Sequence, residues 1–196
     1  MIVNYAEKNG EALRRGDNWK LNPNRHEIIK LSPEQEECVD GIFTSLYQRS
    51  PKNFAKDRCQ DAALFLLAGL WEYGLASEIM IGDVICRGQP VYNTTIKALK
   101  KELRNGHRYK VGSFQPLHCW IHIGGLILDP VCRWYTDGEP GYVLCSSENM
   151  ESADNVYSPL VAGFEFILRT NSHPLSDVLL SLKTALPQRM ERWQKV

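Results

Sequence analysis

The chain has 196 residues, and its 23 basic and 23 acidic side chains give a formal net charge of zero. Hydrophobic residues make up 43% of the sequence and charged residues 23%, as in an ordinary globular protein. The balanced charge argues against binding to nucleic acid or to a membrane surface through bulk positive charge. The longest apolar run, residues 62–71, is about half the length of a membrane span.

The beginning of the chain and its cysteines bear on the compartment in which the protein works. The first ten residues are polar and partly acidic, without the apolar segment of a secretory signal. The cysteines are dispersed and form no C-x-x-C pair: Cys38, Cys59, Cys86, Cys119, Cys132 and Cys145. We therefore expect reduced thiols in a cytoplasmic protein. Export by a route without a cleaved signal stays open.

The sequence contains no internal repeat, low-complexity tract or linker, which predicts one domain over residues 1–196. Residues 1–31 are polar and rich in Gly and Asn, and we expect an irregular N-terminal arm. A helix follows, with Ser32 as its cap and Pro33 at its first position. This helix should end at Ser50, just before a proline.

A second helix, buried on most of its surface, is predicted over residues 57–74. Apolar side chains fill nearly every position of residues 62–71. Asp57 is expected to accept hydrogen bonds from the first turn, and Gly74 to end the helix. Cys59 then lies in the first turn, where free N–H groups and the helix dipole stabilise a thiolate, the nucleophilic form of the side chain. A buried structural cysteine is the alternative.

A strand and a basic helix are predicted next. Residues 77–86 are rich in β-branched side chains and end at a glycine-containing turn. Residues 92–104 show apolar side chains at helical spacing, and five basic residues lie between Lys97 and Arg108. A charged run of this kind usually forms a solvated face, or alternatively grips an acidic partner.

Residues 117–130 predict a β-hairpin around the two-residue turn Gly124-Gly125. Strand alternation gives the first strand two faces, one with His118, Trp120 and His122 and the other with Cys119, Ile121 and Ile123. Pairing across the turn brings the beginning of the first strand near the end of the second. We therefore expect His118 and Asp129 to be near-opposite, with the Asp129 carboxylate able to reach the His118 ring.

The C-terminal third is less regular. We expect a polar loop at residues 133–140, strands at 142–145 and 163–168 separated by a soft segment at 146–155, and a helix from 174 to 195 that breaks at Pro187. Together the elements predict the α+β class, with the Cys59 helix packed on an antiparallel sheet.

Cysteine, histidine and aspartate now stand in the order that a cysteine acyl-transfer site uses. A histidine in contact with Cys59 takes the thiol proton, and an acid behind the histidine fixes its tautomer and supports its charge. His118 and Asp129 are the candidates for these two roles. Taken singly, His118 could be a core histidine bonded to a carbonyl, and Asp129-Pro130 could be a turn.

These residues also resemble a known family. Cys59-x-x-Ala62-Ala63, His118-x-Trp120-Ile-x-Ile and Leu128-Asp129-Pro130 are similar in order and spacing to the transglutaminase-like branch of the papain-like superfamily. The resemblance covers residues 57–130. It implies a papain-like/transglutaminase-like fold with Cys59 as nucleophile, His118 as general base and then acid, and Asp129 as the orienting carboxylate.

The implied reaction is cleavage or transfer at an amide bond of a protein or peptide through a thioester, as a protease, glutamine deamidase or transglutaminase. Hydrolysis is favoured, because water is always available and no amine-binding pocket can be identified. The chain departs from the family in a long insert, residues 89–115, and in Val131 after Asp129-Pro130, where Thr or Ser is usual. The alternatives are a cell-wall-type cysteine amidase, whose D-C-S/G start is absent around Cys59, and an inactive interaction module with the same fold.

Two further features of the site are less determined. The backbone N–H of Cys59 is an obvious oxyanion donor, and Asn53 or Gln115 could supply the second. A zinc site formed from histidines and cysteines near the hairpin is conceivable: His107, Cys119, His122 and Cys132. We expect no metal and no cofactor, because Cys119 should lie on the other strand face and the spacings match no structural-zinc pattern.

Overall fold

A computed structural model describes residues 31–55, 57–105, 117–136, 138–139, 141–146, 151–152, 155–170 and 175–194. The predicted N-terminal arm, apart from Leu31, lies outside these residues, as does Gln115. The helices are α2 (Pro33–Arg49), η1 (Pro51–Phe54), α3 (Cys59–Glu72), α4 (Ile96–Asn105), α5 (Arg133–Thr136), α6 (Phe164–Thr170), α7 (Ser176–Met190) and η2 (Glu191–Gln194). The strands are β1 (Ser77–Cys86), β2 (Gln89–Pro90), β3 (His118–Ile123), β4 (Leu126–Asp129), β5 (Val143–Ser146), β6 (Glu151–Ser152) and β7 (Asn155–Ala162).

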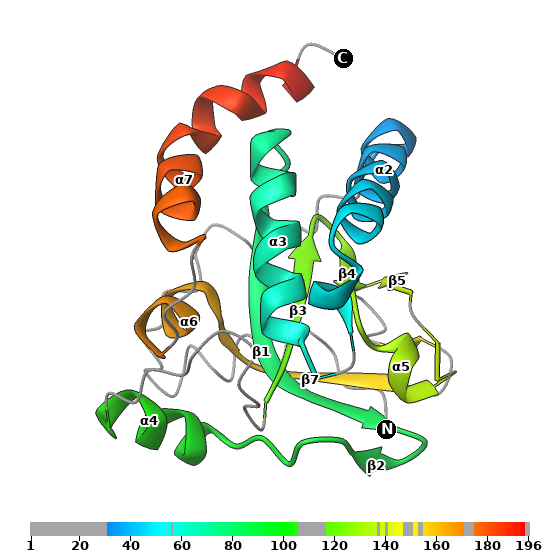
Figure 1. The fold of residues 1–196 in the computed structure, drawn as a ribbon, viewed down its shortest axis with the longest axis vertical. Helices are drawn as coiled ribbons and strands as arrows, with labels where there is room; N and C mark the ends of the chain where they lie inside the picture. Colours follow the sequence, from blue (N-terminus) through cyan, green and yellow to red (C-terminus); the bar gives the residue numbers. More distant parts are fainter. Residues whose placement is uncertain are drawn as a thin grey trace.

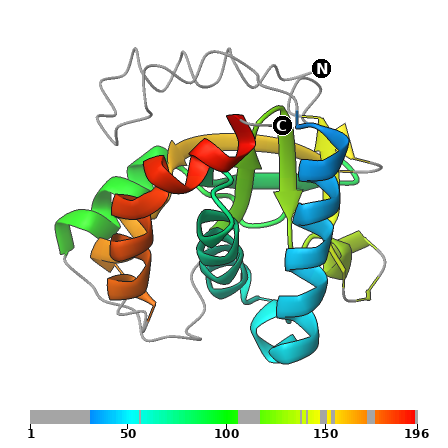
Figure 2. The same cartoon turned by 90° about the horizontal axis from the view of Figure 1, so that it is seen from above.

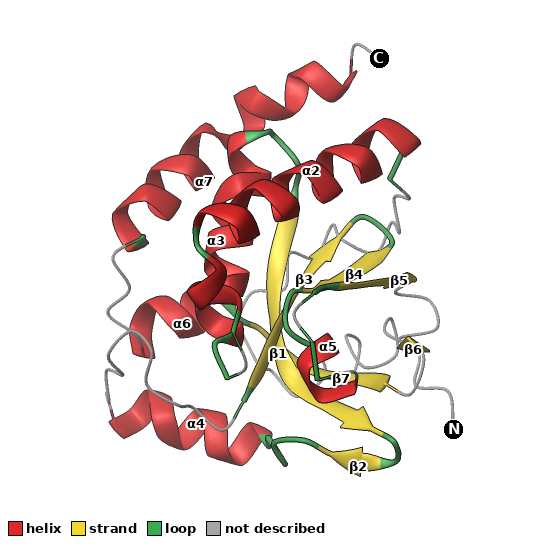
Figure 3. Ribbon diagram, turned by 45° about the vertical axis from the view of Figure 1, so that its right-hand side comes forward, coloured by secondary structure: helices red, strands yellow, loops and turns green. Residues whose placement is uncertain are grey.

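The strands form one antiparallel sheet with the order β5-β4-β3-β1-β7-β6, and β2 pairs with the far end of β1. The sheet curls so that its two end strands, β5 and β6, approach each other. Helices and strands are mixed along the chain, and the strands pair without a parallel crossover (Figure 3). The predicted α+β class is therefore confirmed.

Helix α3 lies at the centre of the molecule, against the sheet and between α2 and α7 (Figures 1 and 2). Ten of its side chains are buried, and Leu64, Leu66, Leu67 and Leu70 are completely so. Burial of each such leucine stabilises the fold by roughly 1.5–3 kcal/mol. The near-continuous apolar run that predicted this helix thus reflects its position, because α2, α7 and the sheet all pack against it.

The two faces of β3 contribute to two separate apolar clusters, as strand alternation predicted. Cys119, Ile121 and Ile123 pack in the main core with α3, whereas Trp120 packs with Met80, Val84, Ile127, Cys132 and Tyr157. The edge of Trp120 meets Tyr157 at a ring-centroid distance of 5.3 Å. The sheet is therefore buried on both faces around β3, and His118 belongs to the same strand face as Trp120.

Helix α2 begins and ends where the sequence predicts. The Ser32 hydroxyl accepts a hydrogen bond from the Gln35 N–H at 3.3 Å, and the Gln35 side chain accepts one from the Ser32 N–H at 2.9 Å. This reciprocal capping box satisfies two N–H groups that the helix cannot pair internally. The C-cap is Ser50, whose N–H bonds to the Leu46 carbonyl.

The predicted cap of α3 is wrong. The helix begins at Cys59 with Arg58 as its cap residue, and no side chain caps it. Asp57 adopts a left-handed conformation, with φ of 65°, and its carboxylate accepts a hydrogen bond from the Tyr135 hydroxyl instead. The acidic residue of the first turn is Asp61, which pairs with Arg58. The predicted stop at Gly74 is confirmed, with φ of 78°.

Three predictions in the C-terminal third are also wrong. The strand predicted at 163–168 is replaced by helix α6 from residue 164 onward, the loop at 133–140 contains the short helix α5, and the soft segment contains β6. The strand beside β1 is β7, which ends at Ala162. Gly163 then bonds through its N–H to the Ile79 carbonyl at 2.6 Å and starts the helix. Because β7 already occupies that edge of β1, the β-branched and aromatic residues after it have no strand to pair with.

Two helix boundaries differ from the predictions. Helix α4 begins at Ile96 rather than at residue 92, because the buried Asp83 carboxylate accepts hydrogen bonds from the N–H groups of Tyr92 and Thr94. Helix α7 passes through Pro187 to Met190 and then tightens into η2. Arg189 and Trp193, which donate to carbonyls at the end of α3, hold this region in place.

Candidate active site

Cys59 is the first residue of α3 and lies where that helix meets the beginning of β3. Its sulfur is 3.5 Å from the carbonyl oxygen of Leu117, to which the thiol can donate. Only 4% of the residue is exposed. The N–H of a first helical residue has no acceptor within its own helix, so it points out of the helix end together with the positive end of the dipole. Cys59 therefore combines a thiol, a free N–H and an electropositive helix end.

His118 and Asp129 are hydrogen-bonded and completely buried. The distance from His118 Nε2 to Asp129 Oδ2 is 2.6 Å, and neither side chain is exposed. The other carboxylate oxygen, Oδ1, accepts the N–H groups of Val131 and Cys132, each at 3.0 Å. These amides hold the carboxylate in one orientation, and the carboxylate in turn fixes the imidazole ring.

The hairpin register explains how the two side chains meet. His122 pairs with Ile127 and Ile121 with Leu128, so Asp129 stands level with Trp120 rather than with His118. The expectation that His118 and Asp129 are near-opposite is therefore off by two residues. The contact forms along the diagonal, where side chains two positions apart on the same face still reach each other. The predicted reach of Asp129 to the His118 ring is confirmed.

Cys59 and His118 perturb each other in the direction that favours an ion pair. A hydrogen bond from the Cys119 thiol and the nearby His118 outweigh burial and lower the pKa of Cys59 to about 6. Burial alone would lower the pKa of His118, but the charge and hydrogen bond of Asp129, together with Cys59, raise it to about 10. Between these two values the thiolate and the imidazolium are the stable forms.

The two ring nitrogens of His118 have different surroundings. Nε2 is bonded to Asp129, whereas Nδ1 is buried and makes no hydrogen bond of good geometry. A buried polar atom without a partner is costly, and Nδ1 shares this state with the Trp120 ring nitrogen and the Tyr157 hydroxyl. Cys59, which shifts the His118 pKa, is the neighbour with which Nδ1 can exchange a proton.

Cys119 is a neighbour of Cys59 that the sequence analysis considered only as a zinc ligand. It lies on the strand face opposite to His118, as expected, but Cys59 packs against that same face in the main core. Burial and the neighbouring Cys59 raise the pKa of Cys119 well above its ordinary value, so Cys119 stays a thiol. A thiol can donate a hydrogen bond to the Cys59 thiolate. This contact could have been predicted, because alternation places Cys119 on the face of β3 that packs against α3, and Cys59 begins that helix.

Two tyrosines surround His118 and were also missed. The Tyr92 ring stacks on the His118 ring at 5.8 Å with an interplanar angle of 12°, and the Tyr135 ring meets it edge-on at 6.3 Å. The two tyrosine hydroxyls are hydrogen-bonded to each other, and that of Tyr135 also donates to Asp57 at 3.4 Å. Both tyrosines lie outside the segments that carry the three predicted catalytic residues, and nothing in their sequence context marks them.

The predicted oxyanion donors fall in different positions. The Cys59 N–H is at the helix start, as expected. Asn53 is buried in η1, and its role stays a prediction. Gln115 lies outside the described residues.

The groups considered for metal or partner binding do not converge. Within the described ranges, no three His, Cys, Asp or Glu side chains gather as a metal-ligand set. Of the residues considered for zinc, Cys119 and Cys132 belong to different apolar clusters, and His107 is not among those described. On the basic helix α4, Lys97, Lys101 and Arg104 are exposed, as expected for a solvated face.

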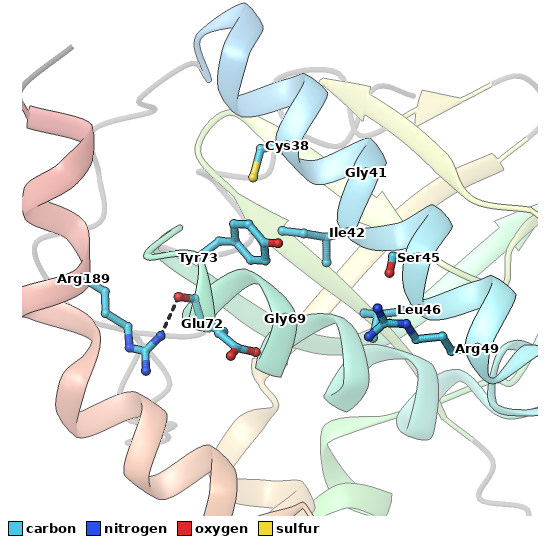
Figure 4. A pocket seen from close by; sticks show the side chains of 10 residues that line it. All are labelled: Cys38, Gly41, Ile42, Ser45, Leu46, Arg49, Gly69, Glu72, Tyr73 and Arg189. Carbon is cyan, nitrogen blue, oxygen red and sulfur yellow. Dashed lines mark hydrogen bonds between the residues drawn. The ribbon is translucent and has the colours of Figure 1, made fainter.

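A groove of about 750 Å³ lies at the other end of α3. It is bordered by α2, by Gly69, Glu72 and Tyr73 of α3, and by Arg189 of α7, which donates to the Glu72 carbonyl (Figure 4). At 1.5 Å per residue, Gly69, the first residue of α3 that lines the groove, lies about 15 Å along the helix from Cys59. The groove therefore does not belong to the cluster around Cys59.

In the described part of the chain, no helix has both the length and the apolar character needed to cross a membrane. Comparison with protein-family models, with curated proteins and with solved structures found no match for this chain. Any functional conclusion therefore depends on the geometry of the site itself.

Proposed function

We propose that this chain is a cysteine-dependent amide-bond enzyme of the papain-like/transglutaminase-like kind. The observation that carries the proposal is the buried 2.6 Å hydrogen bond between His118 Nε2 and Asp129, which leaves Nδ1 for Cys59 at the beginning of α3. Three side chains from distant parts of the chain are thereby combined in the arrangement that acyl transfer requires.

The chemistry follows from the two pKa values. With the pKa of Cys59 lowered to about 6 and that of His118 raised to about 10, the resting site at neutral pH holds a thiolate and an imidazolium. The thiolate attacks a carbonyl carbon, and the new oxyanion faces the Cys59 N–H. His118 then donates its proton to the departing amine, and a thioester remains.

The second half of the reaction decides the product. Neutral His118 takes a proton from an incoming water, the hydroxide attacks the thioester, and Cys59 leaves as a thiolate while His118 again carries the proton. An incoming amine would give transamidation by the same steps. We favour hydrolysis of a protein or peptide substrate, as protease or deamidase, because the site needs only water to complete the cycle.

The reactivity of the six thiols tests the proposal. Iodoacetamide at pH 7 should alkylate Cys59 far faster than the other five cysteines, and His118→Ala should abolish that preference. His122→Ala is the matched control, because His122 lies on the same face of β3 as His118 but four residues further along the strand. Equal labelling of all cysteines would instead favour a binding module that has the fold without the chemistry.

The acyl-transfer half needs a carbonyl probe. An activated ester such as p-nitrophenyl acetate should acylate Cys59 in a burst, detected as released p-nitrophenolate and as an acetyl group on Cys59 in a peptide mass map. Comparison of a proteome incubated with the wild-type protein and with Cys59→Ala then identifies the substrate class. New chain termini would indicate proteolysis, and a gain of about one dalton at glutamine would indicate deamidation.

A further inference from the structure

The tyrosine pair over the candidate site links three segments of the chain. Tyr92 comes from the turn before α4, Tyr135 from α5, and Asp57 from the residues before α3. The rings of Tyr92, Tyr135 and His118 are in mutual contact, with centroid distances of 5.8 to 6.3 Å. Cys59 has 4% of its surface exposed and is close enough to both tyrosines to raise their pKa values. Separation of the two tyrosines would open this side of the site to a substrate carbonyl.

The direction of the hydrogen bonds singles out one hydroxyl. A phenol has one proton to donate, and Tyr135 donates its proton to Asp57. In the bond between the two hydroxyls, Tyr92 is therefore the donor and Tyr135 the acceptor. When the pair separates, the Tyr92 hydroxyl can donate its proton to another acceptor beside the His118 ring.

The turn that carries Tyr92 is held by a buried carboxylate. Asp83 of β1 accepts the Tyr92 N–H at 3.0 Å and the Thr94 N–H at 3.0 Å, and it also accepts the Val84 N–H at 2.9 Å. Gly82, which pairs with His118 on the neighbouring strand, presents no side chain beside the imidazole. The Tyr92 ring is thus placed on His118 by a backbone anchor. Its hydroxyl is hydrogen-bonded to that of Tyr135.

We propose that Tyr92 is a further catalytic residue, whose hydroxyl exchanges the Tyr135 oxygen for the carbonyl oxygen of the substrate and supplies the second oxyanion donor. This inference rests on the acyl-transfer function proposed above. The exchange keeps the number of hydrogen bonds constant and replaces a neutral acceptor by one that becomes charged, which strengthens the bond in the transition state. Burial and the nearby Cys59 raise the pKa of Tyr92, so the hydroxyl retains its proton at neutral pH.

Two probes of Cys59 separate access from oxyanion stabilisation. Iodoacetamide reacts at a saturated carbon and reports access and ionisation of the sulfur, whereas p-nitrophenyl acetate passes through an oxyanion. Tyr92→Phe and Tyr135→Phe both remove the hydroxyl bond and keep the rings, so both should accelerate alkylation of Cys59 several-fold. Only Tyr92→Phe should lower the ratio of acylation to alkylation, by roughly 10²-fold, as expected for loss of one oxyanion donor.

Controls keep each outcome decisive. Tyr47→Phe alters a half-buried tyrosine of α2 that stacks on Phe43 at 5.9 Å, and it should change neither rate. Tyr92→His, which keeps a ring with an N–H donor, should restore part of the ratio and covers the case in which Tyr92→Phe fails to fold. Equal ratios of acylation to alkylation in Tyr92→Phe and Tyr135→Phe would overturn the oxyanion role of Tyr92. Unchanged alkylation rates in both variants would show that the tyrosine pair does not limit access to Cys59. Absence of acylation in the wild-type protein would instead refute the proposed function.

Discussion

The two ends of α3 belong to one helix but have opposite surroundings. At its beginning, Cys59 is buried against β3 with His118 and Asp129, and the ionisable groups shift one another. At its end, Gly69 and Tyr73 border a groove that is also lined by α2 and by Arg189 of α7. The groove thus lies away from the perturbed groups. Under the proposed function, the side chains that shift one another's pKa indicate the site, and the groove does not.

The largest effect should come from Asp129→Asn at the Cys59 end. An asparagine can still accept the amides of Val131 and Cys132, but its NH2 group would face His118 Nε2 and require the wrong tautomer. We expect acylation of Cys59 to fall by about 10³–10⁴-fold with the fold retained, measured as burst rate and by circular dichroism. Glu72→Gln, at the groove end, should leave the burst unchanged. A fall of less than tenfold in the burst rate of Asp129→Asn would show that the Cys59 end is no more important for acylation than the groove end.

The pH dependence of alkylation should show the lowered pKa directly. Because the pKa of Cys59 is lowered to about 6, its thiolate is lost as the pH falls through 6, and the rate at pH 5 should be about tenfold below that at pH 7. Acyl transfer should also decline above pH 10, where His118 loses the proton that the departing amine needs. An alkylation midpoint near 8.5, the ordinary cysteine value, would show that the Cys59 end has no special electrostatics.

A smaller effect should follow from Cys119→Ala. The hydrogen bond from Cys119 is the largest cause of the lowered pKa of Cys59, so its removal should move the alkylation midpoint upward by about one unit. Alkylation of Cys59 at pH 6 would then fall several-fold, with a smaller change at pH 8. Cys132→Ala is the matched control, because Cys132 is also a buried thiol but belongs to the cluster on the other sheet face. Identical midpoints in both variants would exclude Cys119 as the cause.

The smallest effect on reactivity should come from the groove end. A Cβ at Gly69 would lie 2.7 Å from Ile42 Cγ2 and 3.3 Å from Leu46 Cδ1, so Gly69→Ala forces α2 away from α3. We expect a loss of about 1–3 kcal/mol in the free energy of unfolding, measured by denaturant titration, and an unchanged alkylation rate at Cys59. A change in reactivity as large as that of Cys119→Ala would show that the two ends are coupled.

Local signals in the sequence predicted the elements that hold the three candidate residues. The capping box at Ser32, the apolar run after Cys59 and the Gly124-Gly125 turn depend on neighbouring residues only, and the structure contains each of them. The contact between His118 and Asp129 followed from the hairpin, because a short turn limits which residues can meet. Its register was misjudged by two positions, since equal distance from a turn is only an approximate guide.

Features that depend on distant residues could not be read from the chain. Residues 163–168 favour a strand locally, but β7 takes the edge of β1, and a register shift between Ile81 and Gly82 accommodates the stretch containing Pro159. Asp57 is a good cap residue by type, yet its backbone turns left-handed. Tyr92 reaches His118 because Asp83, nine residues earlier, binds its N–H. Each outcome depends on contacts between segments of the chain, which a local sequence pattern cannot predict.

The central strand has a consequence for how the candidate site assembles during synthesis. One edge of β1 pairs with β3, but the other pairs with residues 155–162, which leave the ribosome after Asp129. A nascent chain that already contains Cys59, His118 and Asp129 still exposes an open edge of β1, so the sheet beneath the sulfur is incomplete. Biosynthetic order therefore delays completion of the sheet beside Cys59 until residues 155–162 have emerged.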